Sequence, residues 1–168
     1  MPARSLLSLS AVFALSACSV IRGGSSAPLP AGTSVTENGI TWILPYGPAT
    51  RPFTPAVRVG DLLFLSGQIG TDANARGELI AGGIKPETRQ TMLNIKDVVE
   101  KSGSSMARVV KCTVFMADMR EWGDMNEVYV TFFPTNKPAR SALGANGLAL
   151  GAKVEIECIA KAGDAPAP

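Results

Sequence analysis

The alternation of apolar and polar residues predicts a series of short strands along most of the chain. Compact or period-two apolar runs, bounded by Gly, Pro, Asn or Asp, are typical of strands. They occur at residues 40–44, 56–59, 62–66, 109–116, 139–143 and 153–161. Asn38-Gly39 indicates a turn into the first of these strands, and Gly60-Asp61 has the two-residue spacing of a tight hairpin between the next two.

Apolar residues at helical spacing predict two helices. The first begins at Pro86, a residue favoured at the first helical position, and closes at Gly103. The second runs from Trp122 to Phe133, with its apolar residues three or four apart. Strands followed by a helix, a strand, a helix and further strands indicate a single α+β domain in which both helices cover one face of a small sheet.

The last predicted strand raises the question of what covers the second face of the sheet. Glu155 and Glu157 alternate with Ile156, Cys158 and Ala160, so the two carboxylates point away from the helix-covered side. Such a pair of carboxylates is either solvated or in contact with other subunits. The pattern alone leaves both alternatives open.

The composition fits one domain and excludes several classes of chemistry. The chain has 168 residues, of which 46% are hydrophobic, enough for one core. Lys and Arg number 16 against 14 Asp and Glu, which gives no electrostatic footprint for a nucleic acid, so none is expected as a partner. Histidine is absent, which removes Ser-His-Asp triads, Cys-His dyads and nearly all catalytic zinc sites. Chemistry is left to Arg, carboxylates, hydroxyls, thiols and the backbone.

The start of the chain has the layout of a bacterial signal peptide. Arg4 precedes an apolar stretch at residues 6–15, and small residues follow up to Cys18. The stretch is too short to span a bilayer, which needs roughly 20 apolar residues. Leu15-Ser16-Ala17-Cys18 resembles a lipobox, in which the Cys thiol is acylated and becomes the new N-terminus. A buried helix that ends in an ordinary Cys is the alternative interpretation.

These features predict how the chain is divided and where it is found. The predicted parts are a signal peptide at 1–17, the lipidated Cys18 with a flexible tether at 18–34, a folded domain at 35–162 and a tail at 163–168. Acyl chains contribute about 0.8 kcal/mol per buried CH₂, which makes a lipid anchor the expected contact with the membrane. Ser19 resembles the sorting position of lipoproteins that reach the periplasmic face of the outer membrane.

The two remaining cysteines, Cys112 and Cys158, lie on the apolar side of their predicted strands. They fit the pattern of small buried hydrophobic residues. A disulfide between them is the alternative in an oxidising compartment. It depends on the order of the strands, which the sequence does not give.

Several motifs lie in an order and at a spacing that match a known family. They are Ser66-Gly67-Gln68, Lys111-Cys112-Thr113-Val114-Phe115, Asn126-Glu127-Val128-Tyr129, Pro138-Ala139-Arg140-Ser141 and Val154-Glu155-Ile156-Glu157. With these motifs, the chain from about Pro55 to Ala162 resembles the Rid (YjgF) family of reactive-intermediate deaminases. The last two segments are the most specific.

The resemblance implies a fold, an assembly and a reaction. The family fold is similar to a bacterial chorismate mutase, a homotrimer whose three sheets pack into a central barrel with helices outside and a cleft at each subunit interface. That assembly would cover the second face of the sheet. The family reaction is the hydrolysis of 2-imino and 2-enamino acids, such as 2-aminoacrylate, to a 2-keto acid and ammonia. It needs neither a cofactor nor a metal.

The resemblance also implies two catalytic residues. Arg140 would bind the substrate carboxylate, because a guanidinium fork matches two oxygens and remains charged at any working pH. Glu155 would hold and polarise the attacking water as a general base. Without the resemblance, an ion pair of Arg140 with Glu155 or Glu157 is the simpler interpretation.

The substrate-binding positions that the resemblance implies are Phe53, Ser66, Gly67, Asn126, Tyr129 and Ala142. Gly67 and Ala142 would contribute backbone groups, and Gly67 lets the chain approach a ligand closely. For Tyr129, packing in the core is the more ordinary role. Phe53 stands where the family commonly has a Tyr, and the missing hydroxyl would alter substrate choice or rate.

The leading hypothesis is a lipid-anchored deaminase that removes reactive imino acids outside the cytoplasm. The first alternative is a trimeric module that holds a small carboxylate ligand in the same clefts without turnover, which Phe53 favours. The second is an envelope scaffold or holdase, which rests on the anchor and the assembly alone.

Overall fold

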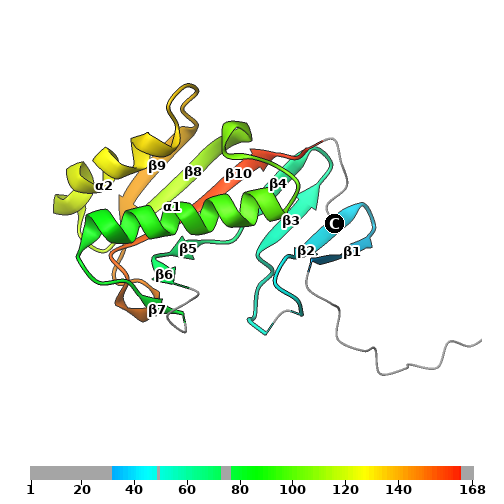
Figure 1. The fold of residues 1–168 in the computed structure, drawn as a ribbon, viewed down its shortest axis with the longest axis horizontal. Coiled ribbons are helices and arrows are strands. Elements are labelled where there is room, and N and C mark those ends of the chain that lie inside the picture. Colours follow the sequence, from blue (N-terminus) through cyan, green and yellow to red (C-terminus); the bar gives the residue numbers. More distant parts are fainter. Residues whose placement is uncertain (1–31, 49, 73–76, 164–168) are drawn as a thin grey trace, which may run out of the picture.

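The computed structural model describes residues 32–48, 50–72 and 77–163, which form an α+β domain built on one mixed sheet (Figure 1). The strands of this sheet are β1 (Thr33–Glu37), β2 (Ile40–Leu44), β3 (Ala56–Val59), β4 (Leu62–Leu65), β5 (Gln68–Ile69), β8 (Val109–Met116), β9 (Ala139–Gly144) and β10 (Val154–Lys161). Their order is β1-β2-β3-β4-β10-β8-β9, and β5 pairs with β10 beyond the end of β4. Neighbouring strands are antiparallel except β8 and β9, which run parallel.

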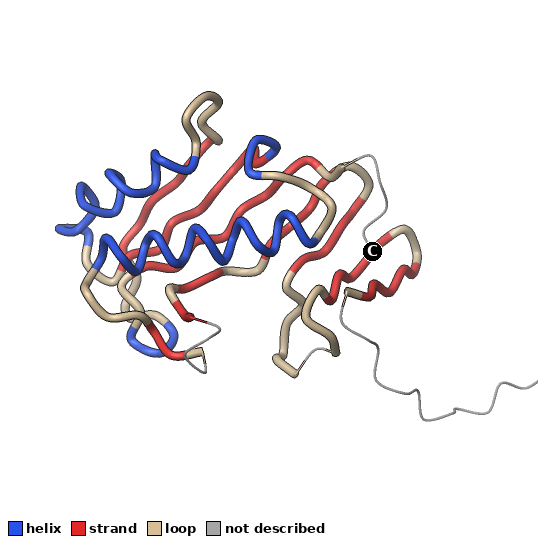
Figure 2. The backbone as a smooth tube through the Cα atoms, viewed as in Figure 1, coloured by secondary structure: helices blue, strands red, loops and turns tan. Residues whose placement is uncertain are grey.

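The described residues form two α-helices, α1 (Ile84–Lys101) and α2 (Trp122–Tyr129), which pack against each other. Helix α1 crosses the sheet in front of β8 and β10, and α2 lies beside it near β9, so both cover one face (Figure 2). A two-stranded sheet of β6 (Thr71–Asp72) and β7 (Glu78–Leu79) precedes α1. The short 3₁₀ helices are η2 (Met106–Arg108), η3 (Met119–Glu121), η4 (Val130–Phe132) and η5 (Ala149–Gly151).

The hydrophobic core lies between α1 and the covered face of the sheet. Met92 and Ile95 of α1 are fully buried together with Val114 of β8 and Ile156 of β10. The apolar residues at helical spacing in α1 and those at every second position of β8 and β10 therefore lie in the same buried layer, as the sequence predicts.

A disulfide crosses this buried layer. Cys112 of β8 and Cys158 of β10 are directly paired in the antiparallel register and are bonded to each other. Both residues are buried on the helix side, as their position in the apolar pattern predicts. The sequence leaves the order of the strands open. The pairing of β8 with β10 is what brings the two cysteines together.

The second face of the sheet keeps apolar side chains in solvent. Leu62, Phe64 and Leu143 are 43%, 41% and 44% exposed. Glu155 and Glu157 lie on this face, because the residues that alternate with them are buried. The prediction that the two carboxylates point away from the helices is confirmed, and neither α1 nor α2 covers this face.

The structure differs from the predicted elements at β1 and in both helices. β1 precedes the first predicted strand, begins at Thr33 within the predicted tether, and pairs with β2 through the Asn38-Gly39 turn. Helix α1 begins at Ile84, so Pro86 is its third residue rather than its first. The missing N–H of Pro86 is harmless there, because the first N–H groups of a helix have no intrahelical acceptor. Helix α2 ends at Tyr129, and the chain continues into η4.

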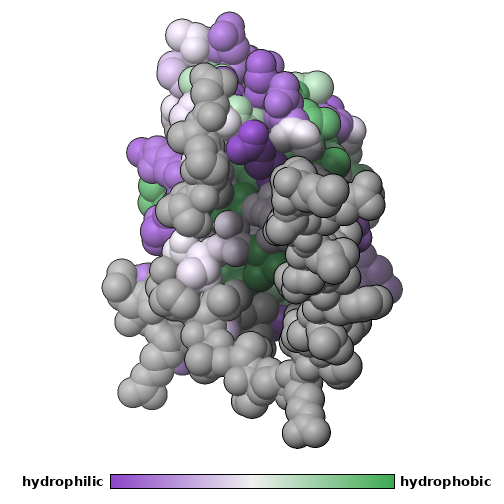
Figure 3. All heavy atoms as spheres, turned by 90° about the vertical axis from the view of Figure 1, so that its right-hand side faces the viewer, coloured by the Kyte–Doolittle hydropathy of each residue, from purple (hydrophilic) through white to green (hydrophobic). Residues whose placement is uncertain are grey.

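Residues 1–31 and 164–168 lie outside the described residues, and with them the predicted signal peptide, Cys18 and most of the tether. Within the ranges that the structure describes, no helix has the length and apolar character needed to cross a membrane. The end of the molecule next to β1 and β2 has hydrophobic and hydrophilic residues side by side on its surface (Figure 3).

Candidate active site

A pocket of about 560 Å³ opens on the helix-free face of the sheet. It brings together four of the predicted site residues, Phe53, Ser66, Gly67 and Glu155. Glu155 projects from β10, whereas Ser66 and Gly67 lie between β4 and β5, which both pair with β10. Phe53 comes from the loop between β2 and β3 and is 44% exposed. Residues far apart in the sequence thus meet around one carboxylate.

A bulge in the strand beside β10 shapes this pocket. Between the pairs Ile156–Gln68 and Ile159–Phe64, β10 advances by three residues (159 − 156), whereas its neighbour advances by four (68 − 64). The extra residue lies in the interval that contains Ser66-Gly67, where the chain leaves β4 and enters β5. Bulges of this kind bend a strand and redirect side chains next to it.

Gly67 is required because the carboxylate of Glu155 lies against its Cα. A Cβ at this position would collide with Oε1 of Glu155 and lie 3.0 Å from Cδ and 3.1 Å from Cγ. We predicted that Gly67 allows close approach of a ligand. In the structure, the group that makes this close approach is the side chain of Glu155 itself.

Hydrogen bonds tie the loop that carries Phe53 to the end of β4. The hydroxyl of Ser66 donates to the carbonyl oxygen of Thr54 at 2.6 Å, and the backbone N–H of Ser66 donates to the carbonyl oxygen of Pro55 at 3.0 Å. The hydroxyl proton of Ser66 is therefore already used, so toward a ligand in the pocket that Ser66 lines, this hydroxyl can act only as an acceptor.

Helix α1 holds the other end of the same segment. Asn94 donates from Nδ2 to the carbonyl oxygens of Ile69 and Thr71, both at 2.9 Å. Gln90 in turn donates to Oδ1 of Asn94 at 2.9 Å. Asn94 of α1 therefore holds the segment that follows Gly67.

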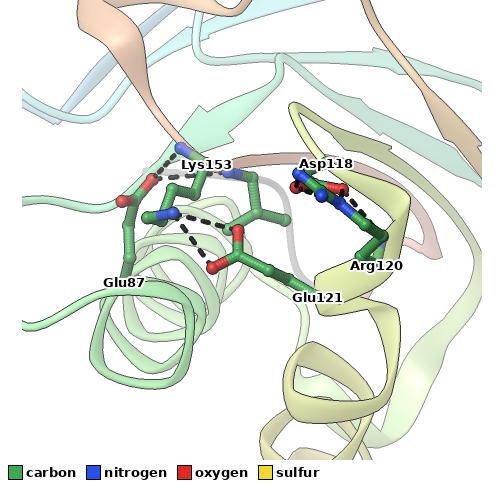
Figure 4. A network of polar contacts seen from close by, with 6 residues as sticks. Glu87, Asp118, Arg120, Glu121 and Lys153 are labelled. Carbon is green, nitrogen blue, oxygen red and sulfur yellow. Dashed lines mark hydrogen bonds and ion pairs between the residues drawn. The ribbon is translucent and has the colours of Figure 1, made fainter.

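A buried carboxylate of α1 fixes the start of β10. Glu87 is 5% exposed, and its Oε1 accepts the backbone N–H groups of Lys153 at 2.7 Å and Val154 at 3.3 Å (Figure 4). Gly70 makes room for it, because a Cβ there would lie 2.9 Å from the carbonyl oxygen of Glu87. The two bonded N–H groups directly precede Glu155, so α1 sets the position of the candidate base.

The same corner of the molecule connects β10 to the start of α2. Lys153 donates from Nζ to both carboxylate oxygens of Glu121 at 3.0 Å (Figure 4). Asp118, just before η3, accepts from the side chain and the backbone N–H of Arg120, and these bonds lower the pKa of Asp118 to about 2. The turn into α2 is thereby held against β10.

The remaining predicted site residues form a second cluster between β9 and α2. Arg140 donates from Nη1 to Oδ1 of Asn126 at 2.8 Å. Its guanidinium lies 4.7 Å from the ring centroid of Tyr129 and 5.5 Å from that of Trp122, within cation–π range. Ala142 lies two residues further along β9 and therefore on the same face as Arg140.

Tyr129 supports Arg140 from within the core. It is 4% exposed and packs against Phe133 with ring centroids 5.1 Å apart. Burial raises the pKa of Tyr129 to about 12, although the nearby Arg140 opposes this shift. Its hydroxyl has no hydrogen-bond partner among the described residues. Within one chain, Tyr129 therefore packs in the core, which is the more ordinary of the two roles considered from the sequence.

Arg140 and Glu155 lie on opposite faces of the sheet in one chain. Arg140 is in register with Cys112, which is opposite Cys158, so it shares their helix side, whereas Glu155 faces the open side. The ion pair of Arg140 with Glu155 or Glu157 is therefore not formed within the described chain. A meeting of Arg140 and Glu155 across a pocket shared by neighbouring chains needs a second copy and stays a prediction.

The two clusters offer complementary chemistry. Glu155 in its pocket can accept a proton from a water molecule, and Arg140 can bind a carboxylate through two parallel N–H groups. The described residues contain no group of three or more His, Cys, Asp or Glu side chains that could hold a metal ion. The chemistry that Arg140 and Glu155 offer is carboxylate binding and proton transfer.

Sequence reasoning missed three residues that shape the site. Arg51 lines the pocket but belongs to no motif or periodic pattern. Glu87 belongs to no predicted motif either, although a carboxylate on the buried stripe of a helix is a usable signal. Trp122 was assigned to the apolar stripe of the second helix, whereas in the structure it is 38% exposed and lies beside Arg140.

Comparison with known proteins places this geometry in a family. The family model described as Endoribonuclease L-PSP matches residues 46–162, a range that contains both clusters. The 2-iminobutanoate/2-iminopropanoate deaminase of Mus musculus is 39% identical over 115 residues, which cover 68% of this chain and 84% of the relative. A RutC family protein of Pyrococcus horikoshii is 42% identical over 109 residues, or 65% of this chain and 86% of the relative.

Solved structures agree in fold. The crystal structure of E. coli TdcF with bound serine is 34% identical, has a TM-score of 0.63, and covers 67% of this chain and 90% of its own. The resemblance drawn from the motifs is thus matched by an independent comparison of sequence and of structure. The chain belongs to the endoribonuclease L-PSP family, which is the Rid/YjgF family that its motifs resemble.

Proposed function

We propose that this protein hydrolyses 2-imino and 2-enamino acids to 2-keto acids and ammonia, in sites that two neighbouring copies build together. The observation that carries the proposal is the division of the predicted residues into two half-sites. Glu155 lies in a pocket on the open face of the sheet, and Arg140 lies on the other face at the edge strand β9. Relatives at 37–39% identity are named 2-iminobutanoate/2-iminopropanoate deaminases, which supports this reaction class.

The exposed apolar face supports an assembly of copies of this chain. Leu62, Phe64 and Leu143 are more than 40% exposed around the strands that carry Glu155. A homotrimer would bury these side chains and bring Arg140 of one copy toward Glu155 of the next. Closed rings of identical subunits use such head-to-tail contacts.

In the proposed mechanism, Arg140 of one copy binds the substrate carboxylate, with its guanidinium positioned by Asn126 and Tyr129. Glu155 of the other copy takes a proton from water as the water oxygen attacks the imine carbon. Glu155 passes this proton to the imine nitrogen as the C=N electron pair moves onto it, which gives a carbinolamine and leaves Glu155 ionised again. Glu155 then takes the hydroxyl proton and delivers it to the amino group, the C–N bond breaks as the C=O bond forms, and ammonia leaves the 2-keto acid. An enamine substrate first gains a proton at carbon, loses one from nitrogen and becomes the imine.

We further propose that the protein is exported and lipid-anchored through Cys18, at the periplasmic face of the outer membrane. The disulfide between Cys112 and Cys158 supports an oxidising compartment, because such bonds are rare in reducing cytosol. Detergent-phase partitioning of cell extracts tests this. The wild-type chain should enter the detergent phase and a Cys18→Ala variant the aqueous phase, and a wild-type chain that stays aqueous would contradict the anchor.

A non-catalytic module that binds small carboxylates is the second candidate function. Phe53, which lines the pocket without a hydroxyl, favours it. The E. coli relative solved with bound serine supports a small amino acid-like ligand in this fold. Carboxylate binding by the purified chain, without any acceleration of imine decay, would select this function.

Mixing two inactive variants tests the shared site. The assay generates an imino acid in situ with an amino-acid oxidase and follows the imine that can still be trapped by semicarbazide. Glu155→Gln should lower kcat about 10²–10⁴-fold, and Arg140→Ala should lower kcat/KM at least about tenfold. Glu100→Gln, a surface carboxylate on α1, is the control and should keep full activity.

When the two variants are unfolded together and refolded as mixed trimers, about a quarter of the sites should combine an intact Arg140 with an intact Glu155. Activity should return to about this fraction of the wild-type value. Two inactive variants that stay inactive after mixing, while wild-type chains recover under the same conditions, would contradict a site built from two copies.

A further inference from the structure

A second pocket adjoins the one that contains Glu155. It has a volume of about 520 Å³ and lies between α1 and the loop that joins β2 to β3. Arg51 and Phe53 line both pockets. A ligand that reacts at Glu155 can therefore extend past these two side chains.

The pocket that contains Glu155 has a larger volume than the smallest imino acids occupy. 2-Iminopropanoate has about six non-hydrogen atoms and takes up roughly 180 Å³, at the ~30 Å³ that one water molecule occupies in the liquid. The first pocket alone has about 560 Å³. This volume leaves room for a substrate with a longer side chain beside the Arg140 guanidinium of a neighbouring copy.

Arg51 is the positively charged side chain at the junction of the two pockets. Among the described residues that line the two pockets, it is the only cation, and it forms no ion pair with a described carboxylate. Its guanidinium lies 5.9 Å from the ring centroid of Phe53, a contact that leaves its N–H donors available. Glu155 and Glu157 line the first pocket, so an anionic group placed there needs a cation beside it.

We infer that Arg51 is a specificity-determining residue, and that the site selects imino acids whose side chain ends in a second carboxylate, such as 2-iminosuccinate. The inference rests on the proposed function, in which Arg140 of a neighbouring copy binds the carboxylate next to the imine carbon. Arg51 is then left for the distal carboxylate, which a guanidinium binds through two parallel N–H groups. Thr50 and Gln68 line the adjoining pocket and supply further polar groups.

The test compares 2-iminosuccinate with 2-iminopropanoate, each generated in situ by an oxidase from aspartate or alanine, on the purified full chain. Arg51→Ala should lower kcat/KM for 2-iminosuccinate about tenfold to a hundredfold, and that for 2-iminopropanoate less than about twofold, because only the former loses a charge-assisted contact. Arg89→Ala removes the same charge from an exposed position on α1 outside both pockets and should leave both values unchanged.

An equal loss for both imines, or no loss for either, overturns the inference. If the wild-type chain hydrolyses neither imine, the proposed function fails, and calorimetric titration with succinate and with butyrate decides the role of Arg51 separately. Weaker binding of succinate alone in Arg51→Ala supports the anion subsite. Unchanged binding of succinate in the variant, or no binding in the wild type, overturns it.

Discussion

Replacing Gly67 by Ala tests whether the position of Glu155 controls the reaction. The new methyl group would collide with Oε1 of Glu155 and lie 3.0 Å from its Cδ, whereas carbon atoms pack at about 3.5–4.0 Å. The carboxylate must therefore shift by roughly 1 Å or change rotamer, at a conformational cost of about 0.5–1.5 kcal/mol. A misplacement of ~1 Å can lower a rate about a hundredfold, which corresponds to about 2.7 kcal/mol of transition-state stabilisation.

Stability should change little in this variant. Gly67 does not have a positive φ, so Ala can adopt its backbone conformation. The assay is kcat for imine hydrolysis beside the Tm of the same preparation. Gly123→Ala is the matched control, because a Cβ at that position in α2 meets nothing within 4 Å. Wild-type kcat in Gly67→Ala, at unchanged Tm, would refute the idea that Glu155 must stay against the backbone of residue 67.

Three further predictions concern stability. The double variant Cys112→Ala/Cys158→Ala removes a cross-link between residues 46 apart, so its free energy of unfolding in urea should fall by about 2–4 kcal/mol. A reductant should destabilise the wild type by a similar amount and leave the variant unaffected. Tyr129→Phe removes a buried hydroxyl without a described partner, so stability should stay equal or rise by up to ~1 kcal/mol, and a clear fall in Tm would reveal a partner. Glu87→Ala leaves the N–H of Lys153 without its acceptor and should cost about 1–3 kcal/mol, with faster hydrogen exchange at that amide; unchanged exchange would argue against the bond.

Elements governed by local pattern were predictable from the sequence. The Gly60-Asp61 hairpin joins β3 and β4 as its spacing predicts, and the alternation through Glu155 and Glu157 gives the correct faces of β10. β1 was missed because Thr33–Glu37 contains one apolar residue, Val35, so the pattern carries no signal. That strand forms through backbone pairing with β2, a contribution that hydrophobic periodicity does not report.

The arrangement of the candidate site was not predictable from local pattern. The face that Arg140 occupies is set by its parallel register with Cys112, and parallel pairing joins segments that lie far apart in the chain. The disulfide depends in the same way on β8 lying next to β10. Motif resemblance names the residues of the site, but it does not tell which of them share a surface within one chain.

The position of the disulfide has a consequence for how copies of this chain fit together. Cys158, Cys112 and Arg140 stand in one row across β10, β8 and β9. A strand slip that keeps side chains on their own faces moves a strand by two residues, or about 6.6 Å, and the covalent rung forbids it between β10 and β8. The position of the Arg140 guanidinium relative to the Glu155 carboxylate within one chain is an offset along the strands. In a closed ring of identical copies this offset is the same in every chain and therefore affects every contact between neighbours. One sulfur–sulfur bond thus locks one of the two strand pairs that set this offset.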